Sequence, residues 1–165
     1  LARVMTMAGL EVDEIHLIGL PGPEDDRHGF KFTGLSWPED KFVVAEIREV
    51  NKHPDADKLV LCRLEDGTGE HTILTGAPNL YPYVGKGRLE QPIKVAYARE
   101  GAILYDGHKP GFELTKLKKT KIRGFETKSM VCSAKELGIS EEHEGIIILE
   151  PDAPTGVATA SWPLV

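Results

Sequence analysis

The chain has 165 residues and a formal net charge of −6, with 41% hydrophobic and 28% charged residues. This length and balance are typical of one compact domain and exclude a disordered tail. No run approaches the ~18 consecutive apolar residues that a membrane-spanning helix requires. The acidic net charge argues against a protein that coats nucleic acid indiscriminately. Because the first residue is Leu1, we expect a piece of a longer protein.

The first forty residues differ in character from the rest of the chain. A helix-compatible stretch at 5–10 precedes rough apolar alternation at 12–18, which predicts a small α+β flank. Residues 20–40 are rich in Gly, Pro and acidic side chains, a composition typical of an irregular loop or linker. The predicted organisation is an N-terminal flank and linker at 1–40, one domain at 41–151 and a C-terminal flank at 152–165.

From residue 42 onward, short β segments alternate with turn signals such as Asp66-Gly67. This spacing predicts a mainly β fold, an OB-fold five-stranded barrel with short helices. A short helix is predicted at 133–138, where Ser133 and Glu136 have capping-box spacing and Gly138 closes the turn. The expected strands are 42–50, 59–64, 72–75, 93–97, 103–104, 122–123, 129–133 and 146–149.

Residues 109–128, the cationic segment, stand out on an otherwise acidic chain. The segment has seven basic and two acidic residues, a net charge of +5, whereas the remainder has a net charge of −11. Because a Debye length of ~8 Å screens distant charges, remote acidic residues do not cancel such a patch. The segment is either a solvated face that maintains solubility or a site for a polyanion, and the asymmetry favours the second interpretation.

Two stretches, 53–58 and 141–145, combine His with carboxylates and raise the possibility of a metal site. Neither has EF-hand spacing, and exposed turns explain both. At 53–58 we expect the Asp side chains to cap backbone N–H groups. A nucleophilic pair of Cys132 with His53 or His143 is a further alternative, which the apolar surroundings of Cys132 disfavour. No P-loop, GxSxG or HExxH motif occurs.

Six motifs occur in the order found in EMAP-type tRNA-binding domains, which the chain resembles over about residues 42–151. The flanking MTMAGLEV at 5–12 and PDAPTG at 151–156 resemble the entry to and exit from this domain in β subunits of bacterial phenylalanyl-tRNA synthetases. We therefore expect an N-terminal part of such a subunit. The six motifs are HPDADKL at 53–59, GAPN at 76–79, KIRG at 121–124, SMVCS at 129–133, ELG at 136–138 and HEGI at 143–146.

The resemblance implies an OB-fold that binds the tRNA backbone and supports aminoacylation of tRNA(Phe) by other domains. It implies tRNA and the synthetase α subunit as partners in an α2β2 ligase of the cytoplasm, with no membrane or DNA partner. ATP and Mg²⁺ are implied for the full enzyme, while no catalytic residue, metal or cofactor is expected in this part. The tRNA-binding residues that it implies are Lys116, Lys118, Lys119, Lys121, Arg123, Asn79, Ser129 and Met130.

Two departures and three alternatives accompany this assignment. The Ser and Gly usual in the family's RGxxSxGM pattern fall at Thr127 and Ser129, so the backbone there need not adopt positive φ. Asn79 could hold its own loop through hydrogen bonds to the backbone rather than bind RNA. The two cysteines, which form no CxxC pair, fit a reducing cytoplasm. The alternative functions are a structural interaction module of the synthetase, a stand-alone EMAP-type tRNA-binding protein, and an independent hydrolase or metalloenzyme.

Overall fold

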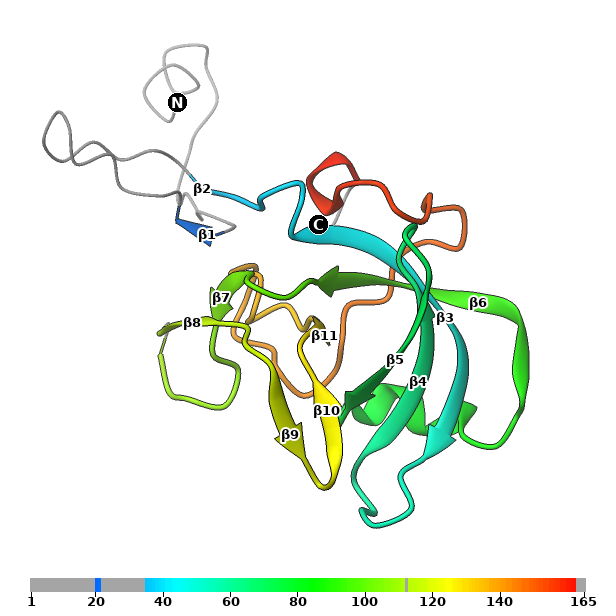
Figure 1. The fold of residues 1–165 in the computed structure, drawn as a ribbon. Coiled ribbons are helices and arrows are strands. Elements are labelled where there is room, and N and C mark those ends of the chain that lie inside the picture. The colour runs from blue at the N-terminus through cyan, green and yellow to red at the C-terminus, as the bar shows by residue number, and fades with distance from the viewer. Residues whose placement is uncertain (1–19, 22–34, 112, 163–165) are drawn as a thin grey trace, which may run out of the picture.

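Five antiparallel strands wind into a nearly closed barrel in the computed structural model, which describes residues 20–21, 35–111 and 113–162 (Figure 1). The spatial order is β11-β6-β3-β4-β5, and the two outer strands, β11 and β5, approach each other across the remaining gap. This arrangement confirms the predicted mainly β barrel. The barrel strands are β3 (Phe42–Lys52), β4 (Val60–Glu65), β5 (Glu70–Thr75), β6 (Arg88–Ala98) and β11 (Met130–Val131).

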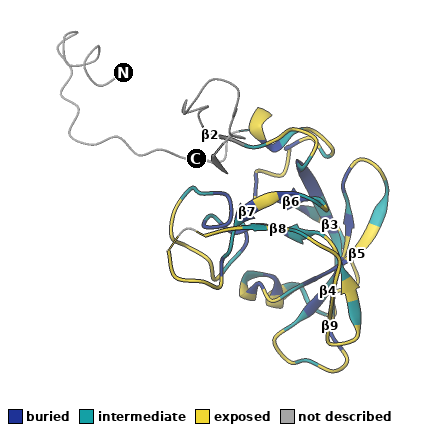
Figure 2. Ribbon diagram, turned by 60° about the vertical axis from the view of Figure 1, so that its left-hand side comes forward, coloured by how far each residue is buried: buried dark blue, intermediate teal, exposed yellow. Residues whose placement is uncertain are grey.

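Strand β3 is the centre of the barrel because it pairs with both β4 and β6. At its start both faces are covered, since Val43 lies in the interior cluster while Phe42 packs with Leu104 and other residues outside it. Buried residues are accordingly dense on β3 and β6 (Figure 2). A register shift between Ile47 and Glu49 forms a β-bulge, which adds the local bend that a long barrel strand needs.

The long connection between β6 and β11 contains the cationic segment and two small hairpins. The first pairs β7 (Ile103–Tyr105) with β8 (Leu114–Lys116), and the second pairs β9 (Thr120–Ile122) with β10 (Phe125–Thr127). The strand predicted at 122–123 lies closer to the N-terminus in the structure. Ile122 is the last residue of β9, and Arg123 lies in the turn that follows.

The predicted helix at 133–138 is wrong, because the segment makes only turns. Its expected caps are nevertheless present. The Ser133 N–H donates to the Glu136 carboxylate, the Glu136 N–H points to Ser133 Oγ at 3.5 Å, and Gly138 has a φ of 72°. The two caps occupy the entire segment, so no interior remains for a run of helical hydrogen bonds. The helices of the described ranges are instead the 3-10 helices η1 (Pro78–Tyr83) and η2 (Thr159–Ser161).

The strand predicted at 146–149 is reduced to one bridge between Ile148 and Val95. Although Ile146 and Leu149 are buried, the Ile146 N–H donates to the Asn79 side chain and the Leu149 N–H to the Lys94 carbonyl, so no continuous ladder forms. The predicted strand at 129–133 likewise shortens to the two residues of β11.

The chain after the barrel packs back onto β3, as the red segment of Figure 1 shows. The Val44 N–H donates to the Val157 carbonyl and the Gly156 N–H to the Val44 carbonyl, both at 2.8 Å. Before the barrel, β1 (Leu20–Pro21) pairs with β2 (Leu35–Ser36) inside the expected linker. The flank elements predicted at 5–10 and 12–18 lie outside the described residues. In the described ranges, no helix has the length and apolarity needed to cross a membrane.

Candidate nucleic-acid interface

The β9–β10 hairpin presents its turn residues through an unusual backbone conformation. Ile122 pairs with Phe125, and the two residues between them, Arg123 and Gly124, have φ values of 48° and 83°. Two positive φ values match the type I′ turn favoured in two-residue hairpins. Gly adopts this conformation freely, whereas Arg does so at a cost of about 1–2 kcal/mol. The turn therefore holds the exposed Arg123 at the tip of the hairpin despite this cost.

The predicted basic residues divide into paired and unpaired side chains. Lys119 forms a salt bridge with Glu126 on the opposite strand at 3.0 Å. In the described part of the chain, the other four form no salt bridge and all are exposed, namely Lys116, Lys118, Lys121 and Arg123.

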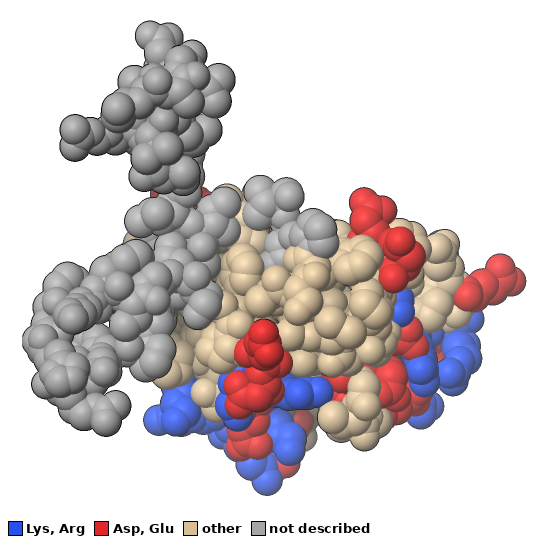
Figure 3. All heavy atoms as spheres, turned by 90° about the horizontal axis from the view of Figure 1, so that it is seen from above, with Lys and Arg blue, Asp and Glu red and all other residues tan. Residues whose placement is uncertain are grey.

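The rest of the cationic segment is partly neutralised in space. Lys109 pairs with Glu113 at 2.8 Å, and Lys128 lies 3.7 Å from Glu100. Figure 3 shows basic and acidic side chains interspersed along one edge of the molecule, beside a broad uncharged face. Within the cationic segment, the unpaired cations of the described residues therefore lie on β8, the β9–β10 hairpin and the link between them.

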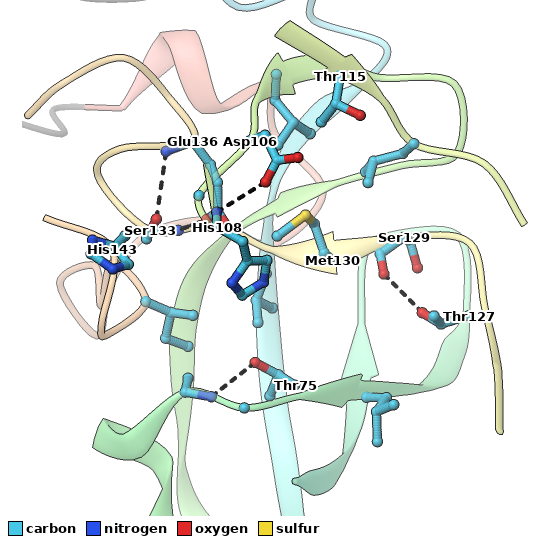
Figure 4. Close-up of a pocket in the computed structure, with 18 of the residues that line it drawn as sticks. Thr75, Asp106, His108, Thr115, Thr127, Ser129, Met130, Ser133, Glu136 and His143 are labelled. Atoms are coloured by element: carbon cyan, nitrogen blue, oxygen red, sulfur yellow. Dashed lines mark hydrogen bonds between the residues drawn. The ribbon is translucent and has the colours of Figure 1, made fainter. Parts of the chain in front are cut away.

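A cleft of about 400 Å³ adjoins the β9–β10 hairpin. Three of the predicted residues, Lys118, Ser129 and Met130, line it. The close-up draws Thr127 and Ser129 at one end and Ser133 and Glu136 toward the other, with the His108 ring between them (Figure 4). The remaining predicted residues do not line the cleft, namely Lys116, Lys119, Lys121, Arg123 and Asn79.

Asn79 joins two distant segments of the fold. Its Nδ2 donates to the Ile146 carbonyl at 2.9 Å, and its Oδ1 accepts from the Ile146 N–H at 3.2 Å. Both polar ends of the amide therefore have protein partners, and the loop that Asn79 holds is not its own. An RNA contact by Asn79 stays a prediction.

Ser129 and Met130 sit where the connection returns to the barrel. The Tyr97 hydroxyl donates to Ser129 Oγ at 2.7 Å, and the Thr127 hydroxyl donates to the Ser129 carbonyl at 3.1 Å. Burial raises the pKa of Tyr97, which keeps its hydroxyl protonated as the donor to Ser129. These bonds fix the backbone that leads into β11, where Met130 is half-buried.

The other chemical candidates have structural roles. The turn predicted at 53–58 is confirmed, but the capping group is the buried His53, whose Nδ1 accepts from the Asp55 N–H at 3.0 Å, rather than an Asp side chain. Burial raises the pKa of the Cys132 thiol well above its usual range, and a protonated buried thiol is a poor nucleophile. Within the described ranges, no group of three or more His, Cys, Asp or Glu side chains is placed to hold a metal ion.

Two residues that line the cleft, His108 and His143, are missing from the set of tRNA-binding residues predicted from the sequence. They come from separate exposed loops, one between β7 and β8 and one between the 133–138 turn and Ile146. No local sequence pattern relates two such positions. Only the packing of both loops against the same end of the barrel brings them to one cleft.

The chain is similar to a known family and to known proteins. Residues 42–95 match the family described as "Putative tRNA binding domain". The chain is 42% identical over 162 residues, 98% of its length, to the phenylalanine–tRNA ligase beta subunit of Dehalococcoides mccartyi. It is 40% identical over 159 residues, 94% of its length, to that of Cupriavidus pinatubonensis. The chain spans 17% and 16%, respectively, of the lengths of these relatives.

Among solved structures, the crystal structure of a MetRS related protein from Pyrococcus horikoshii has a TM-score of 0.46 and 17% identity, covering 72% of this chain and 88% of that one. The beta-subunit alignments extend through both flanks of the barrel and over nearly every residue of the chain. The chain is therefore homologous, over almost its whole length, to one segment of the phenylalanine–tRNA ligase beta subunits.

Proposed function

We propose that the chain is the tRNA-binding module of a phenylalanine–tRNA ligase β subunit, and that its unpaired cations contact the phosphate backbone of tRNA. The family match and the homologous subunits support the tRNA partner. The observation that carries the proposed contact is the placement of Lys118, Lys121 and Arg123, which are exposed and have no salt bridge in the described part of the chain.

In this proposal the cations differ in what they do. Arg123 offers a planar guanidinium that can bind a phosphate through two hydrogen bonds, whereas Lys118 and Lys121 act as point charges. Because contacts to phosphate position an RNA without reading its bases, we expect little selectivity among tRNA sequences from the hairpin. The module would raise the local concentration of tRNA for a reaction that other domains catalyse.

The wider assignment concerns parts of the enzyme outside this chain. We propose a cytoplasmic aminoacyl-tRNA synthetase in which this β subunit joins an α subunit, as an α2β2 enzyme that attaches phenylalanine to tRNA(Phe). In this proposal ATP and Mg²⁺ bind to other domains of that enzyme.

The direct test removes three of the four unpaired cations together. Substituting Lys118, Lys121 and Arg123 with Ala is expected to weaken tRNA binding about a hundredfold at 50 mM salt. Each lost phosphate contact reduces the slope of log K against log salt by about 0.7–0.9, so three should reduce it by about 2–3. Fluorescence anisotropy of labelled tRNA between 50 and 200 mM salt measures both quantities.

Two controls separate this effect from net charge. A Lys58, Lys86 and Arg88 triple Ala variant removes the same charge from exposed side chains outside the cationic segment. A Lys119→Ala variant removes the lysine already paired with Glu126 and should have a smaller effect than Lys121→Ala. Equal losses in both triple variants, or unchanged binding in the hairpin triple, would contradict the proposed contact.

A second candidate function is an interaction module that packs against other parts of the synthetase. Ile103 on β7 and Leu114 on β8 favour it, since they are 52% and 48% exposed on one hairpin. If the unsubstituted chain fails to bind tRNA at 50 mM salt, this structural role becomes the better assignment.

A further inference from the structure

We propose that the cleft beside the β9–β10 hairpin receives an unpaired RNA base, so that this module binds a single-stranded part of tRNA. The inference rests on the proposed tRNA-binding function and adds the structural class of RNA that the site accepts. It follows from the apolar floor of the cleft, its polar groups and the position of the cations around it.

The floor of the cleft is apolar. Leu74, Val131 and Ile146 line it and are 7%, 3% and 8% exposed, so packing holds these apolar side chains in place beneath the cleft. A volume of about 400 Å³ lies in the range of small-molecule sites and is large enough for one base with part of its ribose. Phosphate groups gain nothing from such a surface, whereas the face of a base does.

One wall of the cleft is an exposed aliphatic side chain on the basic hairpin. Ile122 lines the cleft and is 43% exposed, although Lys121 and Arg123 flank it in the sequence. A hairpin that served only to present charge would not need an exposed Ile at this position. In contact with a bound base, the same side chain would lose its unfavourable exposure to water.

Polar groups near the cleft can satisfy the edges of a base. The Thr75 hydroxyl accepts from the Ala77 N–H at 3.2 Å, and Ser129 Oγ accepts from Tyr97, so the hydroxyl hydrogens of Thr75 and Ser129 have no acceptor among the described residues. His108, whose ring is also drawn in the close-up, lines the same cleft (Figure 4). Imidazole rings stack on bases, and hydroxyl donors bind their edges. A base within a duplex presents neither its face nor its pairing edge, so the occupant must be unpaired.

The charged side chains around the cleft indicate where the RNA backbone would lie. Lys118 and Lys128 line the cleft on the side of the hairpin, whereas the carboxylates of Asp106 and Glu136 line it elsewhere. A nucleotide with its base on the apolar floor would therefore place its phosphate by Lys118, with the next phosphate toward the tip of the hairpin. The same cations that serve the proposed function then complete the base site.

The test compares two RNAs with equal numbers of phosphates, an unstructured 12-nucleotide strand and a blunt-ended duplex of two six-nucleotide strands, all with 5′-phosphates. We expect the 165-residue chain to bind the single strand about tenfold more tightly, because one bound base contributes stacking of this size. A 2-aminopurine in the strand should change its fluorescence on binding. Ile122→Thr should reduce the single-strand affinity about tenfold and leave the affinity for the paired RNA unchanged.

Ile103→Thr is the matched control, because Ile103 is also an exposed Ile of a short strand but does not line the cleft. His108→Ala provides an independent cleft variant on an exposed loop and should act like Ile122→Thr. Equal affinities for the two RNAs, or equal effects of Ile122→Thr and Ile103→Thr, overturn the base site. If the three-cation variant still loses binding to both RNAs, the proposed function survives that outcome. If neither RNA binds the unsubstituted chain at 50 mM salt, both proposals fail.

Discussion

Arg123 occupies a backbone position that suits Gly or Asn better than Arg. With a φ of 48°, it stores strain at the tip of a hairpin, where a solvent-exposed side chain has no packing role. Asn tolerates the left-handed conformation. We therefore expect Arg123→Asn to raise the free energy of unfolding by about 1 kcal/mol while it weakens tRNA binding by the loss of one phosphate contact. Urea denaturation and tRNA titration measure the two effects.

Arg123→Asn is informative because it is expected to raise stability and to weaken tRNA binding. Arg123→Lys keeps both the charge and the strain, so its stability should match that of the unsubstituted chain and its binding should fall only slightly. If Arg123→Asn were less stable than the unsubstituted chain, the Arg123 side chain would have a structural partner. The interpretation that the strained backbone at Arg123 is retained because it serves binding would then be wrong.

The hydrogen bonds of single side chains also show why some predictions from sequence patterns failed. The capping-box residues Ser133 and Glu136 form the hydrogen bonds that their spacing predicts, yet no helix follows. A pattern of caps identifies two ends but not whether an interior exists between them. Asn79 was equally ambiguous, since its partner Ile146 is distant in sequence and only the closed barrel brings them together.

At the scale of elements, the barrel strands are predictable because each has a continuous or alternating apolar run between turn signals. Strands β8 and β10 were missed because Leu114–Lys116 and Phe125–Thr127 are short, polar and partly exposed. Such strands are defined by their hairpin partners, a property that no local pattern carries. The cleft was missed for the same reason, because segments far apart in the sequence form its walls.

Asn79 ties η1 to the segment that crosses the end of the barrel. Replacing it with Ala removes two hydrogen bonds to the Ile146 backbone and leaves the buried Ile146 N–H without this partner. We expect Asn79→Ala to lower the free energy of unfolding by about 2 kcal/mol, as measured by urea denaturation. Asn51→Ala is the control, since among the described residues the Asn51 side chain bonds only to Glu49 on the same strand. Equal losses in the two variants would contradict this role.

At the scale of the whole molecule, a charged network joins β3, β6 and the C-terminal segment. Glu46 Oε2 accepts from Lys94 at 2.7 Å and from the Thr155 hydroxyl at 3.1 Å, while Oε1 accepts from Arg48 at 2.7 Å. The Glu46 and Lys94 side chains are each only 13% exposed, so water screens this pair weakly. Because β3 and β6 are already paired in the barrel, the connection that this network adds is the one to Thr155 in the C-terminal segment.

Burial alone would raise the pKa of Glu46, but the hydrogen bonds from Lys94, Arg48 and Thr155 outweigh it and lower the pKa from 4.5 to about 2. Burial likewise opposes the hydrogen bonds from Thr68 and Arg99 that lower the pKa of Asp66 to about 2. As the pH falls below about 4.5, the unfolded carboxyl groups therefore bind protons that the folded ones do not. Stability is present above this pH and is lost progressively between about pH 4.5 and 2.

For Glu46, this loss is on the order of 3 kcal/mol. Glu46→Gln should be less stable at pH 7, because its neutral amide pairs poorly with Lys94, but its free energy of unfolding should change less between pH 5 and pH 2.5. Urea denaturation across that range, with the exposed Glu90→Gln as control, measures the difference in slope. A Glu46→Gln variant whose stability falls in parallel with the unsubstituted chain would show that acid acts elsewhere. The expected result, a flatter profile on a lower starting stability, would identify Glu46 as one of the groups whose protonation destabilises the fold in acid.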